Sequence, residues 1–397
     1  ECHDHWSVCR VMNSVYDVAI VGGGIVAASI AYQLAPHVSV CLLEAEDQPG
    51  YHSTGRSAAL YMDSYGPPVV RQLTRASLKF FEQSPEGFCQ YPLISPRGAM
   101  MIASPGQVDA LDAHESMVRS TGAPIRRLKP EEARALVPVL RPEAVASASI
   151  ESRAFDMDVD ALLQGFLRGA AKSAVSIRLR HKVNRLSYSP GSRLANRWEI
   201  AFEDTALAPI HASVLVNAAG AWGDQLATIA GIDALGLVPK RRSVLCFAQP
   251  AIAGVAQWPM VIGVEEDFYF KPDAGQMLGS PANADPVQAH DVVPEELDIA
   301  TAIHRIQQVA ELDIRRPIRT WAGLRSFVAD GSFVGGFDDK YPGFFWAIGQ
   351  GGYGIQRGTA VGSLYAAMIL GRDIPGFIQD EGVELSSLSP QRLRKAS

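Results

Sequence analysis

The order of apolar and polar positions predicts a strand–helix–strand unit near the start of the chain. Two apolar runs, at 17–21 and 38–43, predict strands. Between them, three glycines at 22–24 predict a turn, and residues 25–34 have the composition of a helix. The unit is about thirty residues long, which is typical of a βαβ crossover. We therefore expect the fold to begin at Tyr16.

Later periodicities predict three more helices and a second sheet. Apolar residues at three- and four-residue spacing predict helices over 67–83, 159–174 and about 355–370. Between roughly 240 and 290, several short apolar runs suggest an antiparallel sheet: 241–248, 259–265, 268–272 and 276–281. No linker rich in proline, glycine or serine divides the chain, so we expect two interleaved domains.

The first glycine turn has the composition of a dinucleotide-binding loop. Gly22, Gly24 and Ala27 fit the pattern G-x-G-x-x-A. In such a loop, small residues let the backbone approach a pyrophosphate that lies on the positive end of the helix. Glu44 follows Gly24 by 44 − 24 = 20 residues, where a carboxylate can bind ribose hydroxyls. NAD and FAD both use this motif, and an ordinary glycine turn is the alternative.

Composition narrows the class of protein. The chain has 397 residues, of which 47% are hydrophobic and 20% charged, as in globular proteins. The net charge is 36 − 42 = −6, which argues against non-specific nucleic-acid binding. The uncharged run between Asp204 and Asp224 alternates like a buried strand followed by a loop, so we expect no transmembrane segment.

The cysteines and the first residues of the chain indicate the cellular compartment in which we expect the protein. Five cysteines without a CxxC motif argue against a disulfide framework and a zinc site. Residues 1–14 lack the apolar core of a signal peptide, and we expect a disordered leader there. A metal cluster of Cys2, His3, His5 and Cys9 is the alternative. We expect a cytoplasmic protein, with attachment to the periphery of the inner membrane as an alternative.

Six further segments carry a family resemblance. They are GYHSTGRSAA at 50–59, VNAAGAW at 216–222, PKRRS at 239–243, FYFKPDAG at 268–275, TWAGLRSFVADG at 320–331 and QGGYGIQ at 350–356. With the glycine motif, they make the chain resemble the D-amino-acid oxidase/glycine oxidase superfamily of FAD-dependent oxidoreductases. Within it, the chain is most similar to the bacterial FAD-dependent D-arginine dehydrogenase branch. The similarity runs from Tyr16 to about Arg392.

The resemblance implies an α+β fold of two parts. A Rossmann-like FAD-binding domain of the α/β type is interleaved with an antiparallel-sheet substrate domain. We assign 15–98, 150–225 and 318–390 to the FAD-binding domain. Residues 99–149 and 226–317 form the substrate domain.

The cofactor is predicted to be FAD without a covalent link. In the related sarcosine-oxidase group a cysteine in the C-terminal third holds the flavin, whereas the last cysteine here is Cys246. Amides near the start of the last helix are suited to the flavin N1/C2 edge. A nicotinamide cofactor is the alternative. The expected cofactor residues are Gly22, Gly24, Ile25, Ala27, Glu44, His52, Ser53, Thr54, Arg56, Ser57, Val183, Ala219, Gly220, Gly351, Gly352, Gly354, Ile355 and Gln356.

Two arginines suggest a site for a substrate carboxylate. Arg325 lies in a mostly apolar, strand-like context, where a guanidinium needs a partner. Arg242 shares the alternating face of Val244 and Cys246. A bidentate carboxylate suits both arginines. The alternative is an internal salt bridge, for which Asp330 and Asp267 are the candidates.

The resemblance completes this site. It assigns Arg242, Arg325, Tyr65 and Tyr269 to the wall that holds the carboxylate and the α-carbon. Gly352 and Gln356 line the face near the flavin, with Tyr353 and Ile355 as weaker members. Packing in the core is the alternative role for the two tyrosines.

One departure from the arginine branch changes the expected substrate. That branch has a histidine and a glutamate where this chain has Leu60 and Ala99. A cationic side chain would therefore lose water without gaining a counter-charge, which is costly. We expect a preference for neutral or apolar D-amino acids over D-Arg and D-Lys. If this is wrong, Glu265, Glu266 or Asp267 would supply the charge.

The expected reaction is oxidative deamination of a D-amino acid to a 2-oxo acid and ammonia, by hydride transfer to flavin N5. The electrons would pass to a quinone or another acceptor, or to oxygen, and the chain would act as a monomer or homodimer. Oxidation of N-methyl amino acids or 2-hydroxy acids is a second interpretation. A partner-dependent FAD-binding subunit is a third.

Overall fold

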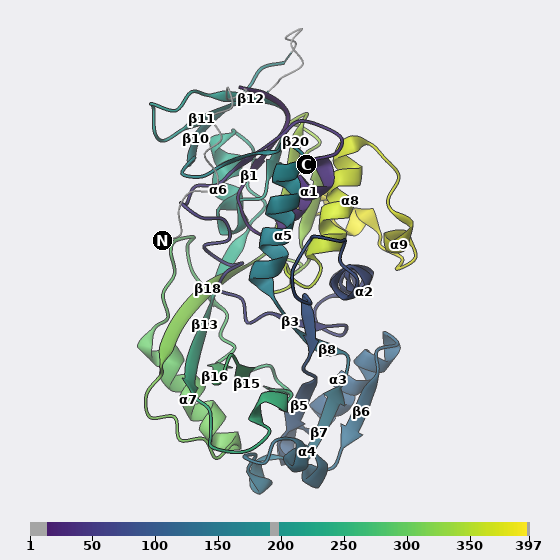
Figure 1. Ribbon diagram of the computed structural model, residues 1–397, viewed down its shortest axis with the longest axis vertical. Coiled ribbons are helices and arrows are strands. Elements are labelled where there is room, and N and C mark those ends of the chain that lie inside the picture. Colours follow the sequence, from purple (N-terminus) through teal and green to yellow (C-terminus); the bar gives the residue numbers. More distant parts are fainter. Residues whose placement is uncertain (1–13, 191–197, 395–397) are drawn as a thin grey trace.

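The structure is a computed structural model that describes residues 14–190 and 198–394. The predicted leader, apart from Ser14, and the cluster considered at residues 2–9 lie outside the described residues. Two large sheets occupy opposite ends of an elongated molecule, and a small sheet lies between them (Figure 1).

The first sheet has eight strands and a parallel centre. β1 (Val15–Val21) pairs in parallel with β2 (Val40–Leu43) on one side and β12 (Ile210–Asn217) on the other. This confirms the predicted βαβ unit and the strand expected between Asp204 and Asp224. The remaining strands are β9 (Ser176–Arg178), β10 (Val183–Tyr188), β11 (Trp198–Phe202), β19 (Val334–Phe337) and β20 (Phe344–Ile348).

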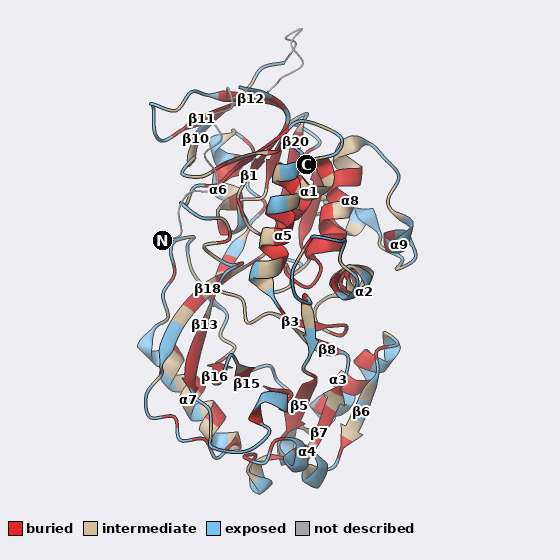
Figure 2. Ribbon diagram, viewed as in Figure 1, coloured by how far each residue is buried: buried red, intermediate tan, exposed pale blue. Residues whose placement is uncertain are grey.

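The helices of this part pack against one another and cover one face of the sheet. α1 (Ile25–Leu34) packs between α5 (Val159–Lys172) and α8 (Gly358–Leu370), and α2 (Pro68–Glu82) contacts α8. In Figure 2, α8 is mostly red, whereas α5 shows exposed residues among buried ones. Helix α1 has the predicted limits. The predicted last helix is shorter than expected, because residues 355–357 belong to the loop before it.

Two smaller helices complete this part. α6 (Gly223–Ile229) packs in the cluster on the opposite face of the sheet, and α9 (Gly376–Gln379) contacts α2. Within residues 14–190 and 198–394, no helix has the length and apolar character needed to cross a bilayer.

The second sheet has nine strands and is antiparallel at every pairing except β14–β5. It confirms the sheet predicted between 240 and 290. Its strands are β5 (Ala99–Ala103), β6 (Ile125–Leu128), β7 (Ser147–Glu151), β13 (Val238–Ala248), β14 (Met260–Gly263), β15 (Tyr269–Asp273), β16 (Gln276–Ser280), β17 (Asp285–Pro286) and β18 (Arg319–Phe327). The boundary drawn at 318 assigns β18 to the FAD-binding domain, yet β18 pairs along β13 in this sheet.

Alternation along these strands separates two apolar clusters. Met100 and Phe247 face a cluster shared with α4 (Pro130–Leu136) and α7 (Glu296–Val309). Met101 and Cys246, one position away, face the other cluster. A side-chain period of two explains this division. The helix α3 (Val108–Ser120) contacts β5 and β7.

A three-stranded sheet links the two parts. It consists of β3 (Leu60–Met62), β4 (Ile94–Pro96) and β8 (Ala154–Met157). From β8, Asp156 accepts a hydrogen bond of 2.8 Å from Lys271 Nζ, and Lys271 is 3% exposed. This buried ion pair ties the small sheet to the second sheet.

Candidate active site

The glycine turn places backbone groups at the carboxyl end of β1. Gly22 has φ +116°, and a Cβ there would lie 2.3 Å from the carbonyl oxygen of Ala218, so a side chain would not fit. Gly23 N donates to Glu44 Oε2 at 2.6 Å. Burial raises the pKa of Glu44, although backbone N–H groups of Glu46 and Gly23 oppose the rise. The turn and the carboxylate are therefore held together by a direct bond.

The strand ends of the first sheet open into a cavity of about 660 Å³. This volume is within the range of cofactor sites, about 300–1,000 Å³. A crevice outside the carboxyl ends of parallel strands is where nucleotide cofactors bind in such sheets. The predicted cofactor residues that line it are Gly22, Gly24, Ile25, Ala27, Glu44, His52, Ser53, Thr54, Arg56, Ser57, Val183, Ala219, Gly220, Gly351, Gly352, Gly354 and Ile355.

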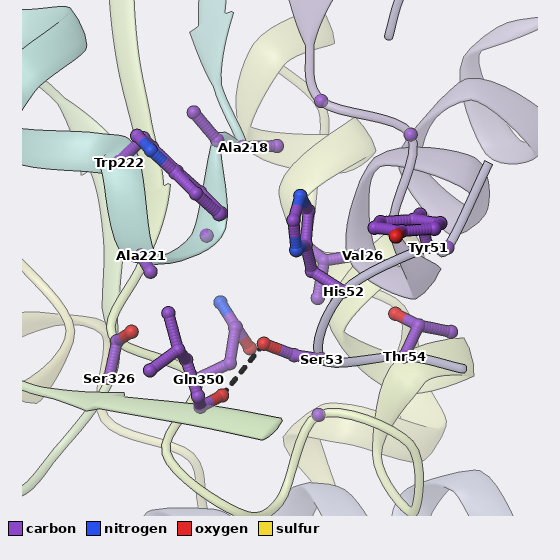
Figure 3. Close-up of a pocket in the computed structure, with 18 of the residues that line it drawn as sticks. Val26, Tyr51, His52, Ser53, Thr54, Ala218, Ala221, Trp222, Ser326 and Gln350 are labelled. Carbon is purple, nitrogen blue, oxygen red and sulfur yellow. Dashed lines mark hydrogen bonds between the residues drawn. The ribbon is translucent and has the colours of Figure 1, made fainter. Parts of the chain in front are cut away.

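The loop over residues 50–57 is tied to the start of α1 and to the second sheet. Thr54 Oγ1 accepts from Ile25 N at 3.1 Å, and Ser53 Oγ donates to the carbonyl oxygen of Leu324 on β18 at 2.7 Å (Figure 3). Arg56 Nη1 donates to two carbonyl oxygens, those of Val292 at 3.0 Å and Ala322 at 3.1 Å. The polar side chains of this loop therefore line the cavity and also fix the position of its wall through hydrogen bonds.

Aromatic rings form one side of the cavity. The centroids of the His52 and Trp222 rings are 4.6 Å apart, and the Tyr51 ring meets His52 edge-on at 4.9 Å (Figure 3). His52 Nε2 also lies 2.9 Å from Glu46 Oε1. Tyr51, His52 and Trp222 thus form an aromatic cluster in this wall, with their rings inclined to one another.

Arg242 and Arg325 meet at the end of the cavity beyond the glycine loop. β13 and β18 are neighbours, and both side chains line the cavity together with Tyr269. Arg325 Nη1 donates to Tyr65 Oη at 3.1 Å, and Arg242 Nε donates to the Asn283 carbonyl oxygen at 2.7 Å. Loss of water and the charge of Arg325 lower the pKa of Arg242. The structure thus gathers the four residues predicted to form the substrate wall.

Within the described part of the chain, neither arginine forms an ion pair with a carboxylate. The two candidates named from the sequence have other partners: Asp330 Oδ2 pairs with Arg392 at 2.7 Å, and Asp267 Oδ2 lies 4.0 Å from Arg305. The Tyr269 hydroxyl is buried beside the Arg242 guanidinium. Two positive charges and this hydroxyl therefore face the cavity end.

Five predicted site residues, Tyr353 among them, do not line the cavity. Gln356, expected beside both flavin and substrate, is 2% exposed, accepts from Met62 N at 3.3 Å and donates to Thr74 Oγ1 at 2.9 Å, so its side chain turns away. Tyr65, Leu60 and Ala99 lie in the apolar cluster that also contains Tyr269. They stand next to the cavity end without forming its wall.

The sequence did not single out several residues of the wall. They are His181, Lys182, Trp222, Gln225, Leu226, Ile229, Asp291 and Gln350. Trp222 and Gln350 belong to segments that carried the resemblance, so their motifs were a signal. Asp291 had none, because it is brought to the site by Arg56, 235 positions away.

The residues present fit a dinucleotide with a flavin. The first-turn N–H groups of α1 have no carbonyl partner within the helix, and its N-cap Gly24 supplies no side-chain cap, which suits a pyrophosphate. Glu44 lies where a ribose would be. None of the three cysteines in the described part, Cys41, Cys89 and Cys246, lines the cavity, which agrees with a non-covalent cofactor. No group of residues suited to hold a metal ion occurs there either.

Comparisons with known proteins agree with this fold and site. The model of the FAD dependent oxidoreductase family matches residues 17–368. FAD-dependent oxidoreductase domain-containing protein 1 of Bos taurus is 24% identical over 89% of this chain and 81% of its own length. Sarcosine oxidase subunit beta of Rhizobium meliloti is 24% identical over 91% of this chain and 85% of its own.

A solved structure extends the likeness to the whole fold. Glycine oxidase from Geobacillus kaustophilus superposes with a TM-score of 0.81 at 21% identity, covering 97% of this chain and 100% of that one. The chain therefore belongs to the FAD dependent oxidoreductase family. It is an FAD-dependent oxidoreductase. The comparisons do not confirm the D-arginine branch expected from the sequence.

Proposed function

We propose that this protein oxidises the Cα–N bond of free D-amino acids, yielding a 2-oxo acid and ammonia after hydrolysis of the imine. One observation carries the proposal: Arg242 and Arg325 face one cavity end without a carboxylate partner among the described residues. Two adjacent guanidinium groups repel each other unless an anion lies between them. A planar carboxylate is the anion that their forked donors bind best.

The clamp fixes the substrate by its carboxylate and leaves its amine free to face the flavin. Bound FAD would supply the acceptor for the hydride, which carries both electrons. Arg325, held by Tyr65, and Arg242, held by the Asn283 carbonyl group, have orientations set before substrate arrives. Because the two side chains are already oriented, less entropy is lost when substrate and flavin are brought into the reactive arrangement. The Tyr269 hydroxyl is available to hydrogen-bond the bound substrate.

The preferred side chain is proposed to be neutral. Leu60, Ala99 and Met62 pack in an apolar cluster with Tyr65 and Tyr269. A carboxylate beside this cluster, Glu151, is the cross-strand partner of Ala99. Burial raises the pKa of Glu151 to about 7, so at neutral pH much of it is uncharged. A cationic side chain would find little counter-charge there.

Anaerobic bleaching of the flavin near 450 nm tests this function. The purified holoprotein is mixed with D-, L- and N-methyl-amino acids. We expect rapid bleaching by neutral D-amino acids and kcat/KM higher for D-Leu than for D-Arg. Bleaching by D-Arg or D-Lys alone would keep the chemistry and refute the side-chain preference. Bleaching by L-amino acids alone would refute the stereochemistry.

A second candidate follows from the comparisons. One relative is named as a subunit of sarcosine oxidase, and a carboxylate clamp serves N-methyl amino acids and 2-hydroxy acids equally well. If N-methyl substrates bleach the flavin faster than primary D-amino acids, this function replaces the first. If the loaded flavin is bleached only when a partner protein is added, the chain is a partner-dependent subunit. Turnover with an artificial electron acceptor, a quinone and oxygen then identifies the acceptor.

A further inference from the structure

We propose that Arg357 sets the reduction potential of the bound FAD by holding a positive charge directly behind the cavity wall. This residue is the N-cap of α8 and is completely buried. The proposal concerns the flavin of this family and does not depend on which substrate is oxidised. Arg357 acts through the loop in front of it and is therefore a positioning residue for the electrostatics of the site.

The guanidinium of Arg357 is poorly compensated. Its Nη2 donates to the Gln350 carbonyl oxygen at 3.2 Å and to Gln350 Oε1 at 2.8 Å, whereas Nε and Nη1 have no hydrogen-bond partner. Its Cζ lies 3.5 Å from the centroid of the Phe333 ring. Among the described residues, no carboxylate comes within ion-pair distance of it. Burial lowers the pKa of Arg357 to about 10, which leaves it charged at neutral pH.

A charge in this position is costly to the folded protein unless something negative offsets it. A π-face and one amide side chain are weaker partners than a carboxylate. The neighbouring tyrosines, Tyr353 and Tyr365, are neutral at physiological pH, because burial raises the pKa of Tyr353 to about 12 and that of Tyr365 still further. The compensating charge must therefore come from a ligand if it comes at all.

The position of the loop in front of Arg357 indicates which part of the bound cofactor lies near this positive charge. Gln350, the residue that Arg357 holds, lines the cavity, as do Gly351 and Gly352 (Figure 3). A Cβ on Gly352 would lie 2.8 Å from Arg325 Cζ, so the loop borders the substrate end of the cavity. The flavin ring of FAD has to lie beside the substrate, whereas the nucleotide part of FAD lies at the glycine turn. Arg357 is therefore on the flavin side of the site.

Reduction adds negative charge to the ring at this end of the site. A fixed positive charge stabilises the reduced form more than the oxidised form and raises the potential. The partly unsatisfied N–H groups at the start of α8 act in the same direction. Because Arg357 is sealed from water, its effect is screened less than that of a surface charge.

The test measures the flavin potential without using any substrate. Holoprotein is titrated anaerobically with a reductant and reference dyes, and sulfite affinity is measured in parallel. Two neutral variants, Arg357→Met and Arg357→Gln, remove the charge, and the second keeps a donor for Gln350. Arg357→Lys at pH 6 retains the charge. Tyr365→Phe is the matched control, because it removes a buried bond to the Val334 carbonyl group in the same core without changing charge.

For both neutral variants we expect a ten- to thirtyfold fall in the equilibrium constant of two-electron reduction, or about 30–45 mV. Sulfite affinity should fall by a similar factor. Arg357→Lys and Tyr365→Phe should keep the wild-type potential. Equal potentials in all five proteins would overturn the proposal, as would a shift in Tyr365→Phe as large as in Arg357→Gln. If amino acids fail to bleach the flavin, these results are unaffected, so the two proposals fail separately.

Discussion

Arg241 and Arg242 are adjacent on β13, yet their surroundings are opposite. Arg241 faces α7, where its Nε lies 2.8 Å from Asp298 Oδ2 and its Nη1 pairs with Glu295. Asp285 lies 3.6 Å away. Arg242 faces the cavity, with a backbone carbonyl oxygen as its hydrogen-bond acceptor and a second arginine nearby. Alternation along one strand thus places one guanidinium in a structural ion cluster and the next in a site.

The difference shows that the role of a buried arginine can be inferred from whether the protein itself supplies a carboxylate partner. Arg241 is neutralised by residues of the same protein, so its charge serves folding. Arg242, Arg325 and Arg357 lack carboxylate partners among the described residues, so their charges are available to ligands. All three remain ionised, because a guanidinium keeps its proton even where water is scarce.

The largest effect is expected at the clamp. Arg325→Met should lower kcat/KM for the best substrate by about 10²–10³-fold, because a desolvated charged contact is lost. The flavin spectrum should stay unchanged, since Arg325 holds the substrate end. Steady-state kinetics and an absorbance spectrum check this. A loss below about threefold would place the carboxylate elsewhere.

Substitution of the paired arginine should instead affect stability. Arg241→Met leaves Asp298, which is 9% exposed, without its main partner and should cost about 3 kcal/mol in the free energy of unfolding. Arg242→Met, the matched variant one position away, should cost little or raise stability, because it removes repulsion from Arg325. Chemical denaturation of both variants without substrate makes the comparison. If Arg242→Met were the less stable variant, the contrast between the two residues would be wrong.

A buried carboxyl group that lacks a charged partner behaves differently from these arginines, because it can become neutral by binding a proton. Glu151 is 2% exposed, its Oε1 has no partner, and burial raises its pKa from 4.5 to about 7. The folded protein therefore keeps a proton that the unfolded chain loses above its own pKa, and stability falls as pH rises from about 4.5 to 7. Glu151→Gln should stabilise by roughly 2–3 kcal/mol at pH 8 and by almost nothing at pH 4.5. Thermal unfolding at both pH values, with the exposed Glu203→Gln as control, checks the sign.

The smallest effect is expected where both charges meet water. Arg185 Nη2 lies 3.1 Å from Glu199 Oε1, and the two side chains are 60% and 37% exposed. Arg185→Met should change the free energy of unfolding by less than about 1 kcal/mol and leave kcat/KM unaltered. A larger change would mean that loss of any arginine perturbs the protein, which would weaken the conclusions from Arg325 and Arg241.

Local sequence determined the elements and the cofactor class. Helical composition after the glycine turn predicted α1 to the residue, and hydrophobic periodicity predicted α2 and α5 to within about two residues, because both signals depend only on neighbouring positions. The glycine turn followed by Glu44 indicated a dinucleotide, since those residues act within one βαβ unit. The shared face of Arg242, Val244 and Cys246 followed from strand alternation.

Tertiary structure decided which charges have partners. Asp298 reaches Arg241 from 57 positions away, and Asp330 and Asp267 bind other arginines. The turning of Gln356 toward Thr74, the pairing of β18 with β13, and the burial of Arg357 on Phe333 also join segments far apart in the chain. No local pattern encodes such contacts, because the energy of a charge depends on every group that the whole fold brings within a few ångströms of it.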